Sequence, residues 1–296
     1  WICFKCSERG NPVTFVMEHF NASFSEAADF LQTYDYDVET WGDTGSAVDY
    51  SNELSEEEQL LLFISREGQA EATVQNNKFT CPPPPTNMKY LMDNFENPEA
   101  YPFFAYLNSR GVTLEQIRAH NMAYVTHGEV TLTDGRKMSL YNHVIFFTLN
   151  DQGQQVYWNT RSIDPNPLIK SFNAPAREGE YSKRNSIFNL NVAKQCNRIV
   201  IHEGVFDALT VGWDSVATFG KKITEEQINM LLGAARPRNL PIYIFLDNNA
   251  IQEMIEAAQS FRSKGYYNIF YVVNHLDDDA NKLGKEACEV LIEKSI

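Results

Sequence analysis

The chain has 296 residues, of which 43% are hydrophobic, and its formal net charge is −14. This length suits two domains, and the hydrophobic fraction supplies a buried core, so a wholly disordered chain is excluded. No run of about 18 apolar residues occurs, so the sequence predicts no helix that crosses a membrane. The five cysteines are odd in number and mostly scattered, which favours a reducing compartment, here the cytoplasm, over a disulfide framework.

The negative charge is concentrated near the start of the chain. Residues 1–100 hold 18 acidic and 5 basic side chains, whereas residues 161–200 hold 3 acidic and 7 basic ones. A strongly acidic protein is a poor partner for nucleic acid, because phosphate groups attract cations. The basic segment changes this expectation, so the net charge alone does not exclude a nucleic-acid partner.

The chain opens on a pair of cysteines, Cys3 and Cys6, and two short amphipathic helices are predicted over 13–20 and 25–31. Two thiolates at this spacing form half of a tetrahedral zinc site, and a redox motif is the alternative interpretation. His19 is a poor candidate for a further ligand because it lies inside the first predicted helix. From these residues alone, both interpretations stay open.

Residues 32–87 are acidic and weakly patterned, and we predict that they form a linker. One helix is expected within the linker, opening on Ser55 and three glutamates and burying apolar residues of 60–64. Four consecutive prolines, 82–85, stand near its end, and such a run forms a stiff extended spacer.

Residues 88–195 are predicted to form a small α+β domain. An apolar segment leads through Gly111 into a helix over 114–120. Strands are expected at 123–125, 143–149 and 155–161, because β-branched and aromatic residues dominate there. A turn that contains Gly153 joins the last two strands into a hairpin.

Residues 196–296 repeat one unit, a short apolar strand that is usually followed by a helix. Strands are predicted at 199–203, 215–219, 242–247 and 268–273. Helices are predicted at 205–212, 224–235, 251–264 and 283–294. This alternation predicts an α/β fold with a parallel four-stranded sheet and flanking helices.

Acidic residues stand at the carboxyl ends of these strands, where the active groups of parallel sheets gather. They are Glu203, Asp207, Asp247 and the run 277–279. Asp207 follows Glu203 by about one helical turn, which places both carboxylates on facing surfaces. Because Mg²⁺ prefers carboxylate and water ligands, the pattern predicts a metal site.

The first 31 residues resemble the second half of the zinc-ribbon domain of bacterial DnaG-type primases. The shared features are Cys3-Phe4-Lys5-Cys6, Gly10, the apolar segment 14–20 and Phe24-Ser25-Glu26-Ala27. The resemblance implies that Cys3 and Cys6 bind Zn²⁺ in the intact protein, together with a Cys and a His that would precede Trp1. The zinc site is then incomplete in this chain, and a truncated amino terminus is expected.

The same resemblance covers about residues 95–290. Four segments carry it before the acidic block: YLNSRGVTLEQI (106–117), VIFFTLNDQGQQVYWNTRS (144–162), IKSFNAP (169–175) and KRNSIFNL (183–190). It implies a basic ridge that contacts template or nucleotide phosphates through Arg161, Lys170, Asn173, Lys183 and Arg184. Arginine offers a bidentate fork and lysine a point charge, and both suit phosphate oxygens.

The acidic block resembles the Toprim domain, which DnaG-type primases share with type IA and II topoisomerases and some nucleases. The match rests on HEGVFD (202–207) and the later aspartates, and TFGKKIT (218–224), which contains Lys221, resembles the primase version in particular. The resemblance implies that Lys221 joins the nucleotide-binding residues. It also implies nucleotidyl transfer that depends on Mg²⁺ or Mn²⁺.

The Toprim resemblance assigns roles to the acidic residues. It implies that Glu203 and Asp207 form the first metal cluster, that Asp247 forms the second with Asn249, and that Asp279 heads the third. Glu203 is then a metal ligand or a general base, and both roles stay open.

Two positions depart from the family pattern. Where the second motif has a further Asp, this chain has Asn249, whose carbonyl oxygen can coordinate a cation but brings no charge. Where the third motif commonly ends in Asp, this chain has Lys282, and Asp277 and Asp278 would compensate by a shift of register. A diverged active primase, a metal-poor relative and an engineered change at Asn249 are all compatible with these departures.

Together these features predict a DNA primase, which synthesises RNA primers on single-stranded DNA from ribonucleoside triphosphates during replication. A replicative helicase, in trans or fused downstream, and a phage or mobile-element source in a bacterial host cytoplasm are expected with it. The alternatives are a Toprim nuclease or topoisomerase, and a weakened relative that only binds nucleic acid. The predicted domain boundaries are 1–31, 32–87, 88–195 and 196–296.

Overall fold

The computed structural model describes residues 79–274 and 278–295. The predicted zinc ligands Cys3 and Cys6, the helices predicted before residue 78, most of the predicted linker, and Asp277 lie outside the described residues. Within the described part, no helix is both long and apolar enough to span a membrane.

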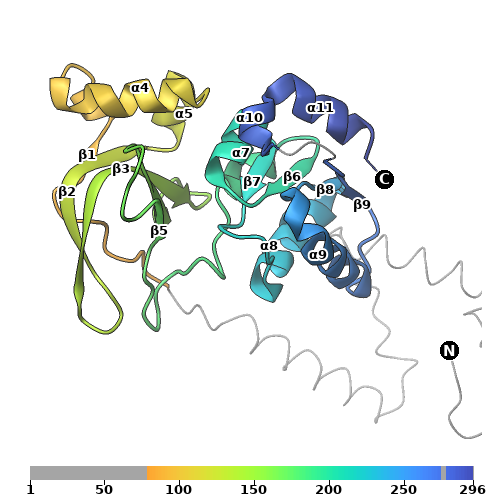
Figure 1. Ribbon diagram of the computed structural model, residues 1–296. Coiled ribbons are helices and arrows are strands. Elements are labelled where there is room, and N and C mark those ends of the chain that lie inside the picture. The colour runs from red at the N-terminus through yellow and green to blue at the C-terminus, as the bar shows by residue number, and fades with distance from the viewer. Residues whose placement is uncertain (1–78, 275–277, 296) are drawn as a thin grey trace, which may run out of the picture. The chain divides into compact units, whose positions relative to one another are not determined.

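The first half of the described chain is an antiparallel sheet of five strands in the order β1-β2-β3-β4-β5 (Figure 1). The strands are β1 (Lys89–Tyr90), β2 (Ala123–Thr131), β3 (Lys137–Leu149), β4 (Gln155–Ser162) and β5 (Ser171–Asn173). Four helices lie between β1 and β2: the 3-10 turns η2 (Met92–Asn94) and η3 (Pro98–Ala100), then α4 (Tyr101–Ser109) and α5 (Leu114–Ala119). The predicted hairpin that joins β3 to β4 is confirmed.

The central strand β3 is buried on both faces over its second half, from His143 to Leu149. One face holds both α4 and the second half: Phe103 of α4 contacts Tyr124 at 4.6 Å, and the Phe146 ring meets Phe206 edge to face, 5.3 Å between centroids. On the other face Phe147 contacts Tyr90 at 6.1 Å, and the neighbouring Trp158 donates to the Pro82 carbonyl at 2.9 Å. This explains why the sequence shows a continuous apolar run there instead of the alternation of a half-buried strand.

The second half is a parallel sheet of four strands in the order β7-β6-β8-β9. The strands are β6 (Ile199–His202), β7 (Ser215–Ala217), β8 (Ile242–Ile244) and β9 (Ile269–Tyr271). The helices are α6 (Leu190–Ala193), α7 (Val205–Val211), α8 (Glu225–Ala235), η4 (Arg236–Arg238), η5 (Asn248–Ala250), α9 (Ile251–Ser263), α10 (Ala280–Leu283) and α11 (Lys285–Glu293).

Helices cover both faces of this sheet (Figure 1). Apolar residues of α8 and α9 pack on one face with Ile201 and Ile244, and α7, α10 and α11 pack on the other with Val200 and Phe245. Burial on both faces accounts for the uninterrupted apolar strands. The predicted α/β and α+β fold, with its four-stranded parallel sheet, is confirmed.

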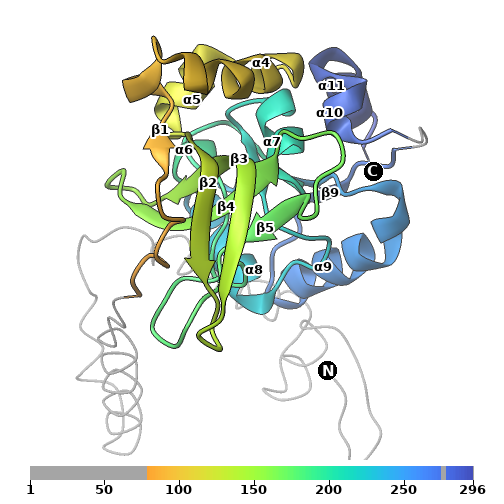
Figure 2. The same ribbon diagram turned by 60° about the vertical axis from the view of Figure 1, so that its left-hand side comes forward.

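The structure differs from the prediction where polar residues form strands. β2 and β3 continue beyond the predicted segments as a long hairpin, visible in Figure 2, that includes residues 126–142. Many of these residues are exposed, so periodicity gives little signal, and the ladder of backbone hydrogen bonds holds them. Gly128 is required in this hairpin, because a Cβ there would lie 2.2 Å from the Thr86 carbonyl oxygen.

The helix predicted over 283–294 is present as α11, and the short helix α10 precedes it. Gly284, with a φ of 81°, separates the two. A left-handed φ suits glycine and interrupts the helical hydrogen bonds, so the two helices take separate directions. The short strands β1 and β5 and the helix α10 were not predicted, because two to four residues carry too little pattern.

Candidate active site

Glu203 and Asp207 are brought together by the turn that joins β6 to α7. β6 ends at His202, Glu203 and Gly204 form the turn, and Asp207 lies in the first turn of α7. The Asp207 carboxylate folds back against Gly204, where an added Cβ would lie 2.7 Å from its Oδ2. A larger residue at 204 would displace this carboxylate, so the glycine allows its present orientation.

Asp247 and Asp279 follow the next two strands of the sheet. Asp247 precedes η5 after β8 and is partly buried, whereas Asn249 within η5 is exposed. Asp279 caps α10, and its Oδ1 accepts a hydrogen bond from the Lys282 backbone N–H at 2.9 Å. The Lys282 ammonium pairs with the Asp278 carboxylate at 3.2 Å. The lysine that replaces the usual aspartate of the third motif therefore lies beside the remaining aspartates.

The charges of neighbouring carboxylates raise the pKa of Glu203, Asp207 and Asp247, so these side chains are close enough to interact. Burial raises the pKa of Glu203 to about 7, and the charges of Asp247 and Asp207 add to the shift, while Lys221 opposes it. Burial raises the pKa of Asp207 to about 6. The hydrogen bond from the Asn281 N–H to Oδ1, at 3.0 Å, lowers this pKa, whereas the charges of Asp279 and Asp247 raise it. Burial and then the charge of Asp279 raise the pKa of Asp247.

This arrangement concentrates negative charge with little internal compensation. In the part of the chain that the structure describes, the carboxylates of Glu203 and Asp247 make no hydrogen bond or ion pair with protein. The donor set is all oxygen, which is the set that Mg²⁺ and Mn²⁺ prefer. Among the described residues no three His, Cys, Asp or Glu side chains are already spaced around a single point as a closed metal site.

Arg161, Lys170 and Asn173 lie along the edge of the antiparallel sheet. Arg161 on β4 pairs in register with Ser171 on β5, and its Nη1 donates a 3.0 Å hydrogen bond to the Ser171 Oγ. Lys170 immediately precedes β5 and is exposed, and Asn173 pairs with Asn159. The structure therefore brings these three predicted residues together on the edge strand β5 and on its neighbour β4.

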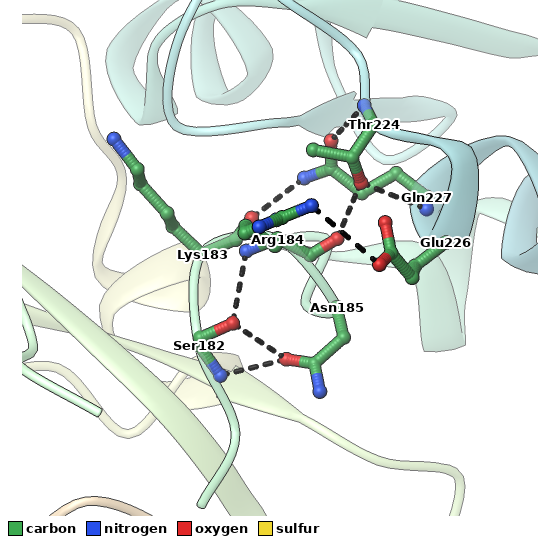
Figure 3. A network of polar contacts seen from close by, with 7 residues as sticks. All are labelled: Ser182, Lys183, Arg184, Asn185, Thr224, Glu226 and Gln227. Atoms are coloured by element: carbon green, nitrogen blue, oxygen red, sulfur yellow. Dashed lines mark hydrogen bonds and ion pairs between the residues drawn. The ribbon is translucent and has the colours of Figure 1, made fainter. Parts of the chain in front are cut away.

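Lys183 and Arg184 lie in the segment 182–186, between β5 and α6, against the first turn of α8 (Figure 3). Both side chains are exposed, and the Arg184 guanidinium lies 3.8 Å from the Glu226 carboxylate. The Lys183 side chain points away from the polar contacts drawn in Figure 3, and its ammonium forms no ion pair with the described residues.

Lys221 follows β7 and lies near the acidic group. Its ammonium pairs with Glu253 of α9 at 2.6 Å, and this carboxylate raises the pKa of Lys221. The charge of Glu203 acts in the same direction on Lys221, so the two side chains are close enough to interact. A phosphate that binds Lys221 therefore competes with Glu253.

Sequence reasoning missed two residues that hold Asp207. The backbone N–H of Asn281 donates to Asp207, and the Asn281 side chain joins the Arg110 carbonyl at 2.9 Å and Thr210 Oγ1 at 2.7 Å. The Arg110 guanidinium lies over the Phe206 ring, 4.4 Å from the centroid, and its charge lowers the pKa of Asp207. Arg110 and Asn281 are 171 positions apart, so no local pattern predicts their contact.

A third missed residue is His202, at the end of β6 beside Glu203. It is 1% exposed, and burial lowers its pKa to about 3. Its ring packs beside Phe245 at 5.1 Å, and its Nε2 has no hydrogen-bond partner among the described residues. The ring is therefore neutral at physiological pH and does not balance the acidic charges.

Comparison with known proteins identifies bacterial DNA primases as relatives. No protein-family model matches the chain. The DNA primase of Listeria monocytogenes is 23% identical over 261 residues, and that of Neisseria meningitidis serogroup A is 26% identical over 269 residues. The alignments cover 77% and 79% of this chain but 39% and 41% of the relatives, so the chain spans about two fifths of their length.

Solved structures agree with this relationship. A DnaG catalytic core, at 19% identity, covers 70% of this chain and 76% of that chain with a TM-score of 0.59. A DnaG primase catalytic domain bound to ssDNA gives 20% identity over 70% and 77% of the two chains, also with a TM-score of 0.59. The structure of the zinc-binding and RNA polymerase domains of the Aquifex aeolicus primase is 20% identical. The match covers 100% of this chain and 73% of that chain, with a TM-score of 0.57.

Proposed function

We propose that this chain, a relative of bacterial DNA primases with the fold of the DnaG catalytic core, synthesises RNA primers on single-stranded DNA. The observation that carries the proposal is the convergence of Glu203, Asp207, Asp247 and Asp279 at one edge of a sheet with that fold. The template, the ribonucleoside triphosphates and a replicative helicase as partner belong to this proposal, as does a cytoplasmic location.

The four carboxylates would hold Mg²⁺ or Mn²⁺, with the Asn249 carbonyl as a neutral ligand. Bound cations supply charge neutralisation of the triphosphate and of the leaving pyrophosphate. With a pKa of about 7, the Glu203 carboxyl is protonated in about half of the molecules at neutral pH before a cation binds. The ionised Glu203 is then a ligand or accepts the proton of the attacking hydroxyl, and the role of base requires it unprotonated.

The protein also orients the acidic group without any cation. Gly204 allows the Asp207 carboxylate to approach the β6–α7 turn, and the Asn281 N–H fixes one of its oxygens. The other Asp207 oxygen, Oδ2, lies against Gly204. Such fixed orientation reduces the rearrangement needed when substrate binds.

The basic residues would bind phosphates on the template or the incoming nucleotide. Arg161, Lys170 and Asn173 occupy one edge of the antiparallel sheet, and Lys183 extends an ammonium without an ion-pair partner among the described residues. Arg184 and Lys221 would exchange their contacts with Glu226 and Glu253 for phosphate oxygens. Exposed pairs of this kind contribute little to stability, so their exchange costs little.

Asn249 and Lys282 predict weak cation binding. Asn249 removes one negative charge from the second motif, and Lys282 adds a positive charge beside Asp278. Affinity for a divalent cation depends on the number of charged ligands, so this chain would need a higher metal concentration than a site with aspartate at both positions. Cys3 and Cys6 would bind Zn²⁺ in the intact protein, as the likeness to a structure with zinc-binding domains supports.

A primer-synthesis assay tests the proposed function. The chain is incubated with a single-stranded template, ribonucleoside triphosphates and Mg²⁺ or Mn²⁺, and short RNA products are resolved by gel. We expect products that require both metal and template. Absence of product from this chain and from the Asn249→Asp variant would contradict the proposal.

The binding-only alternative draws on one observation, the reduced negative charge at Asn249 and Lys282. It predicts single-strand binding that weakens with salt and does not respond to divalent metal. The same preparation distinguishes the two cases, because a binding-only protein retains the template without extending a primer.

A further inference from the structure

The segment 182–186, which carries Lys183 and Arg184, is attached to α8 by one buried side chain (Figure 3). Gln227 is completely buried. Its Nε2 lies 2.9 Å from the Lys183 carbonyl oxygen, 2.9 Å from that of Ser186 and 3.1 Å from that of Thr218. The two amide hydrogens are thus shared among three carbonyl groups, two of them in the basic segment.

The start of α8 fixes the orientation of this amide. Thr224 is the N-cap, its backbone N–H donates to Gln227 Oε1 at 3.0 Å, and its Oγ1 accepts from the Gln227 N–H at 3.2 Å. This capping box leaves only the Nε2 end to face the segment. The Thr224 hydroxyl also donates to the Arg184 carbonyl, so the carbonyl groups of 183, 184 and 186 are all held by α8.

The same amide connects the segment to the acidic edge. Gln227 donates to the Thr218 carbonyl, and the Thr218 backbone N–H donates to the His202 carbonyl at 3.1 Å. His202 immediately precedes Glu203. A short series of buried hydrogen bonds therefore runs from the backbone of Lys183 to the end of β6.

We propose that Gln227 is a positioning residue, which fixes Lys183 and Arg184 relative to Glu203 and thereby sets the affinity for nucleotide phosphates. The part of this inference that concerns phosphate affinity rests on the proposed function. An apolar side chain at 227 would fill the space but leave the carbonyl groups unpaired, and the segment would leave α8 to find water. The amide thus fixes where the unpaired ammonium of Lys183 is presented.

The test uses Gln227→Met, which keeps the length and burial of the side chain but removes the donor. Gln116→Met is the matched control, because Thr113 and Gln116 form the same capping box and the buried Gln116 amide donates to the Leu209 carbonyl, away from the segment. We expect the KM for nucleotide to rise about tenfold in Gln227→Met, with kcat changed less than about twofold. Gln116→Met is expected to lower the melting temperature without changing KM.

A second comparison asks whether Gln227 acts through the basic segment. In a background that carries both Lys183→Ala and Arg184→Ala, Gln227→Met should raise KM by less than about twofold, because the groups that it positions are gone. Full additivity of Gln227→Met with this background would overturn the proposal, since it would show that Gln227 affects the site by another route.

Hydrogen exchange tests the attachment without any substrate. The Ser182 and Arg184 N–H groups donate within the segment, to Asn185 Oδ1 at 2.7 Å and to Ser182 Oγ at 3.2 Å. We expect their exchange to accelerate about tenfold in Gln227→Met and to stay unchanged in Gln116→Met. Equal exchange in both variants, or an unchanged KM in Gln227→Met, would overturn the proposal.

These measurements separate the inference from the proposed function. If the unaltered chain makes no primer, the proposed function fails, and exchange still decides whether Gln227 holds the segment. If Gln227→Met does not fold, Thr224→Val removes the hydroxyl that donates to the Arg184 carbonyl and accepts from the Gln227 N–H. Thr113→Val, which removes the corresponding cap of α5, is its control. The same rise in KM and in exchange is then expected, at a smaller size, and its absence in Thr224→Val overturns the proposal.

Discussion

The acidic edge should destabilise the fold at neutral and alkaline pH, and Glu203→Gln tests this directly. In the folded protein, the pKa of the Glu203 carboxyl is raised from 4.5 to about 7 by burial and by the charges of Asp247 and Asp207. A raised carboxyl pKa means that the folded protein binds more protons than the unfolded chain between these values. Stability therefore falls as pH rises from 4.5 to about 7, and the full cost applies above pH 7.

The size of this cost follows from the shift. One unit of pKa corresponds to about 1.4 kcal/mol, so a shift of about 2.5 units sets an upper limit of roughly 3 kcal/mol. The side chain is partly exposed, and solvent screening reduces this value. We expect Glu203→Gln to be about 1–2 kcal/mol more stable than the parent at pH 8, and the gain to fall to about a quarter of that at pH 5.

Urea unfolding at pH 5 and pH 8, with a chelator present to remove divalent cations, measures the difference. Glu129→Gln is the control, because Lys137 lies 2.8 Å from that carboxylate and lowers its pKa, which is the opposite direction. This variant should gain no stability at pH 8. Equal stability of Glu203→Gln and the parent at pH 8, or the same gain at both pH values, would refute the reasoning.

Three further predictions concern the site. Asn249→Asp adds a charged ligand, so the Mg²⁺ concentration for half-maximal primer synthesis should fall about tenfold, and an unchanged requirement would count against position 249 as a ligand. Gly204→Ala places a Cβ 2.7 Å from Asp207 Oδ2, so this carboxylate must shift and primer synthesis should fall at least about tenfold, and full activity in the variant would show that this orientation of Asp207 is not needed. Lys170→Ala should reduce the slope of log affinity for single-stranded DNA against log salt by about one unit, and an unchanged slope would remove Lys170 from the phosphate contacts.

The fold was predictable from the sequence where apolar strands and helices alternate. The strands β6 to β9 and the helices α7 to α9 lie where short β-branched runs and amphipathic segments were expected. β6 is buried along its length, whereas α8 and α9 each bury one face, so their sequences carry the patterns of a buried strand and of amphipathic helices. The exposed hairpin over 126–142 and the break at Gly284 depend on backbone pairing and on one left-handed residue, which periodicity does not reveal.

The site was predictable only in its residue types. The order of acidic residues after successive strands predicted that Glu203, Asp207, Asp247 and Asp279 would gather, and their mutual effects on pKa agree with that arrangement. The residues that hold them were not predictable. Asn281 reaches Arg110 across 171 positions, and contacts over such separations leave no local signal.

The ion-pair partner of a predicted phosphate ligand was likewise not predictable from the sequence. Lys221 was predicted as a phosphate ligand from its motif, but its pairing with Glu253 depends on how α9 packs beside the loop that follows β7. Gln227 looked like an ordinary helix residue in the sequence. Its importance arises from three carbonyl groups that the fold places around one amide.

The central claim is that the carboxylates after β6 catalyse primer synthesis. The most direct measurement compares RNA synthesis on single-stranded DNA, with Mn²⁺, by the unaltered chain and by Glu203→Gln prepared in the same way. The account predicts short RNA from the unaltered chain and a loss of at least about a hundredfold in Glu203→Gln, which folds at least as well. Equal product from the two proteins would contradict the account.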